Sequence, residues 1–140
     1  PEYPIDHMFL SRWSPRSMTG ESIPRDEVMS LFEAAKWAPS SYNNQPWRFV
    51  FAEQKSKHWT SFFDLLVPFN QSWADKAALL VIVEKAAKLI QLPKDHAIET
   101  MLTVGKKASK EFLPDSGMIE REFPKGRKPL SDIVFEGKMH

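Results

Sequence analysis

Two short stretches of the sequence carry side chains that could bind a ligand: one suits an anion and the other a planar heterocycle. The first runs from Ser11 to Arg16, where Arg12 and Arg16 flank Ser14. If this segment is a loop or a first helical turn, the guanidinium groups and the hydroxyl can converge on one anion. The planar fork of arginine suits phosphate oxygens. A surface loop with solvated arginines explains the same residues, so the segment alone leaves both interpretations open.

The second stretch, Pro39 to Trp47, reads Pro-Ser-Ser-Tyr-Asn-Asn-Gln-Pro-Trp. Its short polar side chains and free backbone N–H groups can be directed at a planar heterocycle, and an amide group can both donate and accept hydrogen bonds. The same residue types are common in ordinary turns between a helix and a strand, so a plain polar turn is the alternative.

A later pair of cations, Lys125 and Arg127, is separated by one glycine. In an extended chain, residues two apart point to the same side, so both cations can reach one anion. A solvated basic tail explains them equally well.

Composition excludes several classes of site. The chain has no cysteine, so it has no disulfide, zinc-thiolate site or thiol nucleophile, and this absence suits a reducing cytoplasm. His58 lacks a metal-ligating neighbour at useful spacing, and we expect no metal. The net charge of +1 and the lack of interleaved aromatic and basic residues argue against nucleic acid. No apolar run approaches the roughly 18 residues of a membrane span, and the first residues do not resemble a signal peptide.

The elements that must position these residues follow from apolar spacing. Residues 25–38 have the pattern of a helix with Val28, Leu31, Phe32 and Ala35 on its core face, and Pro39 ends it. Residues 48–52, 77–83 and 97–105 predict strands, and the unbroken apolar run at 77–83 predicts burial on both faces. A helix is expected at 54–63, followed by an apolar patch that Pro68 closes. Residues 1–10 and 109–128 are expected to be extended or loop-like, and 129–136 to be a short amphipathic closing segment.

The order Ala-Pro-Ser-Ser-x-Asn-x-Gln-Pro-Trp at Ala38–Trp47, with Arg-x-Ser-x-Arg at Arg12–Arg16, resembles the signature of the nitroreductase family of FMN-dependent oxidoreductases. The resemblance implies an α+β fold: one FMN-binding domain over residues 1–140, with a sheet flanked by helices, assembled as an intertwined homodimer with FMN at the subunit interface. It also implies that NAD(P)H reduces the flavin. A small-molecule acceptor such as a nitroaromatic or a quinone would then take the electrons in a ping-pong cycle.

The resemblance also implies roles for individual residues. By position, one set would hold the FMN phosphate, and Lys125 and Arg127 would complete it. A second set would line the flavin ring, with two amides directed at its polar edge. No residue resembles a convincing proton donor, so no catalytic residue is named. The phosphate set is Arg12, Ser14 and Arg16, and the ring set is Pro39, Ser40, Ser41, Asn43 and Gln45.

The sequence departs from the family after the strand at 77–83. That strand is followed almost directly by the pattern of a helix end, at Leu92-Pro93. In relatives a long stretch with a central helix separates these features. We therefore expect an internal segment to be missing near residues 83–88. If it is truly absent, a non-enzymatic or degenerate flavin-binding relative of the same fold becomes the alternative function.

Overall fold

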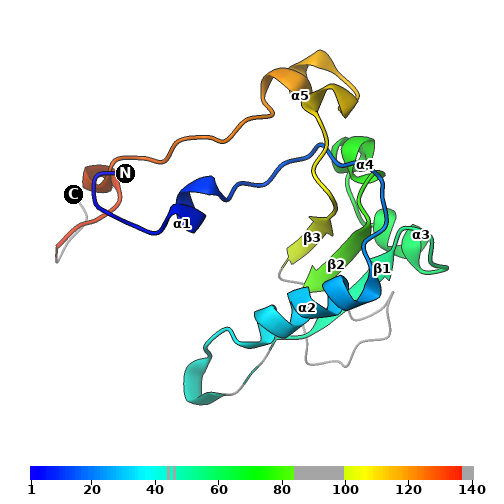
Figure 1. Ribbon diagram of the computed structural model, residues 1–140, viewed down its shortest axis with the longest axis horizontal. Helices are drawn as coiled ribbons and strands as arrows, with labels where there is room; N and C mark the ends of the chain where they lie inside the picture. Colours follow the sequence, from blue (N-terminus) through cyan, green and yellow to red (C-terminus); the bar gives the residue numbers. More distant parts are fainter. Residues whose placement is uncertain (44, 46, 84–99, 137–140) are drawn as a thin grey trace.

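The computed structural model describes residues 1–43, 45, 47–83 and 100–136 of the 140-residue chain. Figure 1 shows a body in which helices surround a small sheet, and an arm in which the two ends of the chain run away from that body. This arrangement is α+β, as predicted. The expected missing segment near residues 83–88 falls almost wholly on residues 84–99, outside the described residues.

The sheet has the order β1-β2-β3 in the described part of the chain, and both pairs are antiparallel. Its strands are β1 (Phe49–Glu53), β2 (Leu79–Val83) and β3 (Thr100–Val104). All five residues of β2 are buried, which confirms the burial on both faces expected from its apolar run. Leu80 and Ile82 pack into one core cluster and Leu79 and Val81 into another, because successive side chains of a strand point to opposite faces.

Helix α2 (Arg25–Lys36) covers one face of this sheet. Val28 is buried, and the ring of Phe32 lies 5.5 Å from that of Phe49 and 5.1 Å from that of Phe51. The predicted core face is wrong at Leu31, which is 49% exposed, since it lies at the edge of the contact stripe. The helix also ends two residues earlier than predicted, because the Trp37 N–H turns back to the Ala34 carbonyl and the Ala38 N–H to the Ala35 carbonyl.

Helices α3 (Trp59–Phe63) and α4 (Pro68–Ala74) cover the other face. The predicted helix at 54–63 is correct only in its last five residues, because the Gln54 N–H pairs with the Ala78 carbonyl and extends the sheet. Pro68 was expected to close an apolar patch, yet it begins α4. Val67 before it is extended, and the missing N–H of a proline costs nothing in the first turn of a helix.

The polar segment 109–128 was expected to be a loop, but it contains η2 (Lys110–Phe112) and helix α5 (Ser116–Glu120). The Asp115 carboxylate accepts the Met118 N–H at 2.8 Å and caps α5, while the Met118 side chain is buried. One cap and one buried side chain are enough to fix this short helix within a charge-rich sequence.

The chain ends also differ from the expected extended arm. Asp6 accepts the Met8 N–H at 2.8 Å and caps α1 (His7–Ser11), which has no buried residue. Beyond α5 the chain is extended up to η3 (Leu130–Asp132). The Leu130 N–H donates to the Glu2 carboxylate at 3.0 Å, so the two ends lie side by side (Figure 1).

Candidate functional site

A hollow of about 230 Å³ lies between the segment that follows α1 and the segment that follows α5. It brings together residues that are more than 100 positions apart in the sequence, including all three members of the predicted phosphate set and both later cations. Its walls are formed by Arg12, Trp13, Ser14, Arg16, Arg121, Glu122, Phe123, Lys125 and Arg127. We call it the basic hollow.

Backbone pairing fixes the first wall of the basic hollow. The Thr19 N–H donates to the Lys106 carbonyl at 2.9 Å, and the Ala108 N–H donates to the Ser17 carbonyl at 3.0 Å. The buried Ser17 hydroxyl donates to the Ser109 carbonyl. The segment that ends at Arg16 therefore continues into a short antiparallel pairing with the chain that leaves β3.

Glycine permits the close approach behind this pairing. A Cβ atom on Gly105 would lie 2.7 Å from the Met18 sulfur, which is buried in the core. The pairing of residues 17–19 is thus anchored by core packing as well as by hydrogen bonds.

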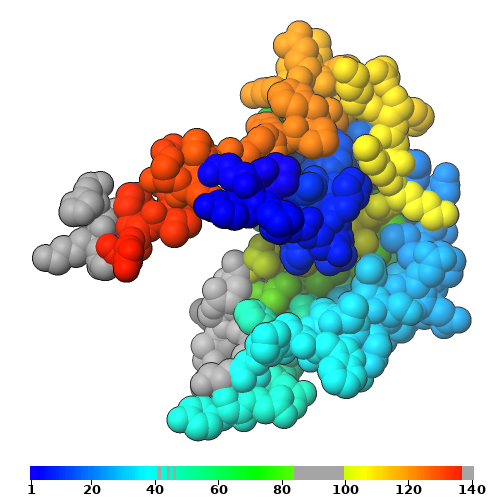
Figure 2. Space-filling model, turned by 60° about the vertical axis from the view of Figure 1, so that its left-hand side comes forward, coloured from blue at the N-terminus to red at the C-terminus, as the bar shows by residue number. Residues whose placement is uncertain are grey.

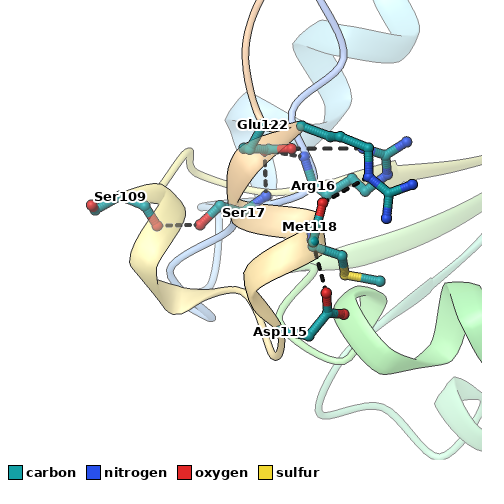
Figure 3. A network of polar contacts seen from close by, with 8 residues as sticks. Arg16, Ser17, Ser109, Asp115, Met118 and Glu122 are labelled. Carbon is teal, nitrogen blue, oxygen red and sulfur yellow. Dashed lines mark hydrogen bonds and ion pairs between the residues drawn. The ribbon is translucent and has the colours of Figure 1, made fainter.

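The second wall depends on Glu122, which sequence reasoning did not single out (Figure 3). Its Oε1 accepts the N–H groups of Arg16 at 2.6 Å and Ser17 at 2.9 Å, and its Oε2 lies 3.8 Å from Nη1 of Arg16. The Glu122 side chain is only 3% exposed. Nothing in the sequence distinguishes this glutamate from the exposed acidic residues around it, because its partners are about 105 residues away.

The electrostatics of the basic hollow favour an anion. Five cationic side chains line it, against the single carboxylate of Glu122, although the whole chain carries a net charge of only +1. Guanidinium groups offer paired donors to phosphate oxygens, and the Ser14 hydroxyl adds a further donor. The arrangement can bind a phosphate-type group.

The predicted ring set lies elsewhere in the chain, in the turn between α2 and β1. Tyr42, Asn43 and Gln45 all have positive φ angles, of 53°, 53° and 45°. The Gln45 N–H donates to the Ser40 hydroxyl at 2.9 Å, and the Asn43 N–H donates to the Ser40 carbonyl at 3.0 Å. The turn therefore folds around Ser40. Ser41 begins η1 (Ser41–Asn43), and two positions within the signature, 44 and 46, lie outside the described residues.

A separate hollow of about 400 Å³ adjoins this turn, and it is lined by Phe32, Lys36, Gln45, Trp47, Arg48 and Phe49. The Nζ of Lys36 lies 2.7 Å from Oε1 of Glu33. This hydrogen-bonded ion pair holds the pKa of the exposed Glu33 carboxyl below its usual value. Of the predicted ring set, Gln45 lines this hollow, while Pro39, Ser40 and Asn43 line neither hollow.

One chain does not bring the two groups of predicted residues together. The turn follows α2 at the lower edge of the body, while the basic hollow is formed by segments on the far side of the sheet (Figure 1). In Figure 2 the turn in cyan lies at the lower edge of the molecule, below the N-terminal segment in blue and the segment after α5 in orange.

Metal ligands do not gather in the described ranges, where no three His, Asp or Glu side chains are placed to hold an ion. In the same part of the chain, no helix has the length and apolar character needed to span a membrane.

Comparisons with known proteins agree with this architecture. An oxidoreductase containing FMN, known from its crystal structure, is 31% identical and superposes with a TM-score of 0.91, over 100% of this chain and 95% of that one. The FMN and NADPH-dependent nitroreductase NfnB from Sphigopyxis sp. strain HMH is only 13% identical, with a TM-score of 0.69 over 94% of this chain and 97% of that one, which supports the fold alone.

A curated relative of this chain is a longer protein. The oxygen-insensitive NADPH nitroreductase of Helicobacter acinonychis (strain Sheeba) is 27% identical over 112 residues, which are 79% of this chain and 51% of that protein. The chain thus spans about half the length of that relative. The sequence model of the Nitroreductase family matches residues 10–116, which include both the Arg12–Arg16 segment and the turn around Ser40. The predicted membership is confirmed: this chain belongs to the Nitroreductase family.

Proposed function

We propose that the protein is an FMN-dependent oxidoreductase that uses NAD(P)H to reduce nitroaromatic, quinone or related acceptors by a ping-pong mechanism. The observation that carries this proposal is the basic hollow, where Arg12, Ser14 and Arg16 share walls with Lys125 and Arg127. Relatives whose names include FMN and NADPH support the cofactor and the reductant.

The donor set of the basic hollow suits the phosphate end of FMN. Two arginines can each present paired N–H groups, and Lys125 and Arg127 add charge from a second segment. A neutral ligand would gain little from five cations, whereas a phosphate monoester would be held by charge and by hydrogen bonds together. We therefore assign the phosphate grip to these residues.

The ring end of the cofactor is assigned to Pro39, Ser40, Ser41, Asn43 and Gln45. The side chains of Asn43 and Gln45 are exposed, and an amide matches the mixed donors and acceptors of a flavin pyrimidine edge. Their distance from the basic hollow within one chain supports a site shared between two copies. In that arrangement one copy holds the phosphate and the other contacts the ring.

An intertwined homodimer is the assembly in which one copy can hold the phosphate while the other contacts the ring. Support comes from large apolar side chains left exposed where a partner could cover them: Phe9 is 66% exposed, Val134 64% and Trp37 78%. Exposed apolar groups at both chain ends are expected where arms pack on another subunit.

FMN, when bound, supplies the chemistry: it takes a hydride from NAD(P)H and returns electrons to an acceptor. The residues of this chain would bind the phosphate and orient the ring. No catalytic residue is assigned.

The experiment that tests the proposal begins with the absorption spectrum of the purified protein and the identity of any acid-released flavin. Bound FMN, followed by NAD(P)H oxidation that depends on a nitroaromatic or quinone acceptor, is the expected result. FMN binding without turnover would favour the alternative, a non-enzymatic flavin binder. A protein that neither contains nor takes up FMN would contradict the proposal.

A further inference from the structure

Glu122 is an unexpected residue in the wall of a hollow that otherwise attracts anions. An isolated carboxylate there would repel a phosphate and would be costly to bury. Its side chain is nevertheless 3% exposed, and it lies among five cationic side chains. The contacts of Glu122 must therefore explain why a carboxylate is buried in this wall.

Those contacts are made with two adjacent residues, Arg16 and Ser17. Oε1 accepts the backbone N–H of Arg16 and that of Ser17, while Oε2 faces the Arg16 guanidinium at 3.8 Å and accepts no hydrogen bond within the described residues. Glu122 thus fixes the backbone of Arg16 by a hydrogen bond and attracts its guanidinium as an ion pair. Figure 3 shows the carboxylate between the Arg16 side chain and the Ser17 backbone.

The segment that carries Glu122 is itself fixed. The Glu122 N–H donates to the Ile119 carbonyl at 3.3 Å, at the end of α5. The neighbouring Arg121 side chain donates to the Gly117 carbonyl at 2.7 Å. The backbone of Glu122 is therefore attached to the end of a capped helix. Its carboxylate can act as a fixed support for the long, flexible side chain of Arg16.

We propose that Glu122 is a positioning residue that holds Arg16 in the orientation in which its guanidinium receives the FMN phosphate. This inference rests on the proposed function. A long side chain that is ordered before the ligand arrives loses less conformational entropy on binding, so positioning strengthens the grip on the phosphate without direct contact.

The alternative is that Glu122 only anchors the backbone. Glu122→Gln separates the two roles, because glutamine keeps an oxygen that can accept the N–H groups of Arg16 and Ser17 but loses the charge facing the guanidinium. Glu120→Gln is the matched control: it makes the same change in charge two residues away, on an exposed side chain outside the basic hollow.

The test compares the Kd of FMN with the Kd of riboflavin, which lacks the phosphate, by titrating the flavin-free protein at constant salt. The ratio of the two constants measures how much the phosphate contributes to binding, separately from any change in the stability of the protein. Thermal denaturation of each variant checks folding. We expect Arg16→Ala to lower the FMN preference by about tenfold or more, since a charge-assisted hydrogen bond is lost.

Glu122→Gln is expected to lower the preference by about threefold or more, and the double variant with Arg16→Ala to lose no more than Arg16→Ala alone. Glu120→Gln should change the ratio by less than about twofold, because exposed charges are screened. Equal weakening of FMN and riboflavin by Glu122→Gln, or a stronger preference for FMN, would overturn the inference. If the unaltered protein binds FMN no better than riboflavin, the proposed phosphate site is itself wrong, and the inference falls with it.

Discussion

A site shared between two copies can be tested by mixing two impaired variants. The first, Arg12→Ala/Arg16→Ala, damages the basic hollow. The second, Asn43→Leu/Gln45→Leu, removes both amides from the turn around Ser40. In one chain these groups lie on separate parts of the molecule, so a dimer with one variant chain of each kind contains one site with all four changes and one site with none.

The expected losses follow from the contacts removed. Two charge-assisted hydrogen bonds contribute about 1.5–3 kcal/mol each, so the arginine variant should bind FMN more than about 100-fold more weakly. Two unpaired polar atoms at the ring cost about 1–3 kcal/mol each, which corresponds to about 25-fold or more. Random pairing of equal amounts gives about half mixed dimers, so about one quarter of all sites are intact.

The assay is FMN retained per chain after gel filtration of co-expressed variants. Each variant alone should retain almost none, and the mixture should recover about one quarter of the unaltered value. Mixing the purified variants without subunit exchange is the control. Mixed dimers that form but retain no FMN would refute the shared site, and so would a monomer that holds FMN.

Three further predictions concern the elements that support the site, and thermal denaturation measures each. Asp115→Ala removes the cap of α5 and should lower the stability by about 1 kcal/mol, while Asp115→Asn should cost less. Tyr42→Gly should raise the stability by up to about 1 kcal/mol, because the fully exposed tyrosine has a φ of 53°, which glycine adopts without strain. A clear loss of stability would show that the tyrosine side chain has a packing partner. Leu80→Ala should cost about 2–5 kcal/mol and Leu31→Ala less than about 1 kcal/mol, and equal losses would contradict the burial difference between them.

Much of the fold was predictable because its signals are local. The unbroken apolar run of β2 reflects burial on both faces, and the charges of α2 follow its dipole, with Asp26 and Glu27 first and Lys36 last. The errors arose where one residue type serves two purposes. Pro68 can end or begin a helix, and only the packing of α4 decides which. Similarly, α5 depends on a single cap and one buried methionine within a charged segment.

The candidate site was predictable to the extent that it follows local motifs. Arg12, Ser14 and Arg16 occur within five residues, so their convergence needed only a short extended segment. Lys125 and Arg127 meet them through the fold, which spacing could not show. Glu122 was missed because its role exists only through Arg16 and Ser17, far away in the sequence. Under the proposed function, the phosphate and ring groups meet only in a second copy, and this arrangement stays a prediction.

The extended segment that follows α5 has a consequence for the susceptibility of the protein to proteolysis. Arg121, Lys125 and Arg127 are exposed there, and the backbone beyond Arg121 has no helix or strand before η3. Trypsin-like proteases cleave after exposed arginine and lysine residues in backbone of this kind. Under the proposed function, these three residues also face the ligand. A bound phosphate would therefore shield the cleavage sites, and a shortage of cofactor would expose them. The rate of limited proteolysis in this segment would then fall when the cofactor is bound.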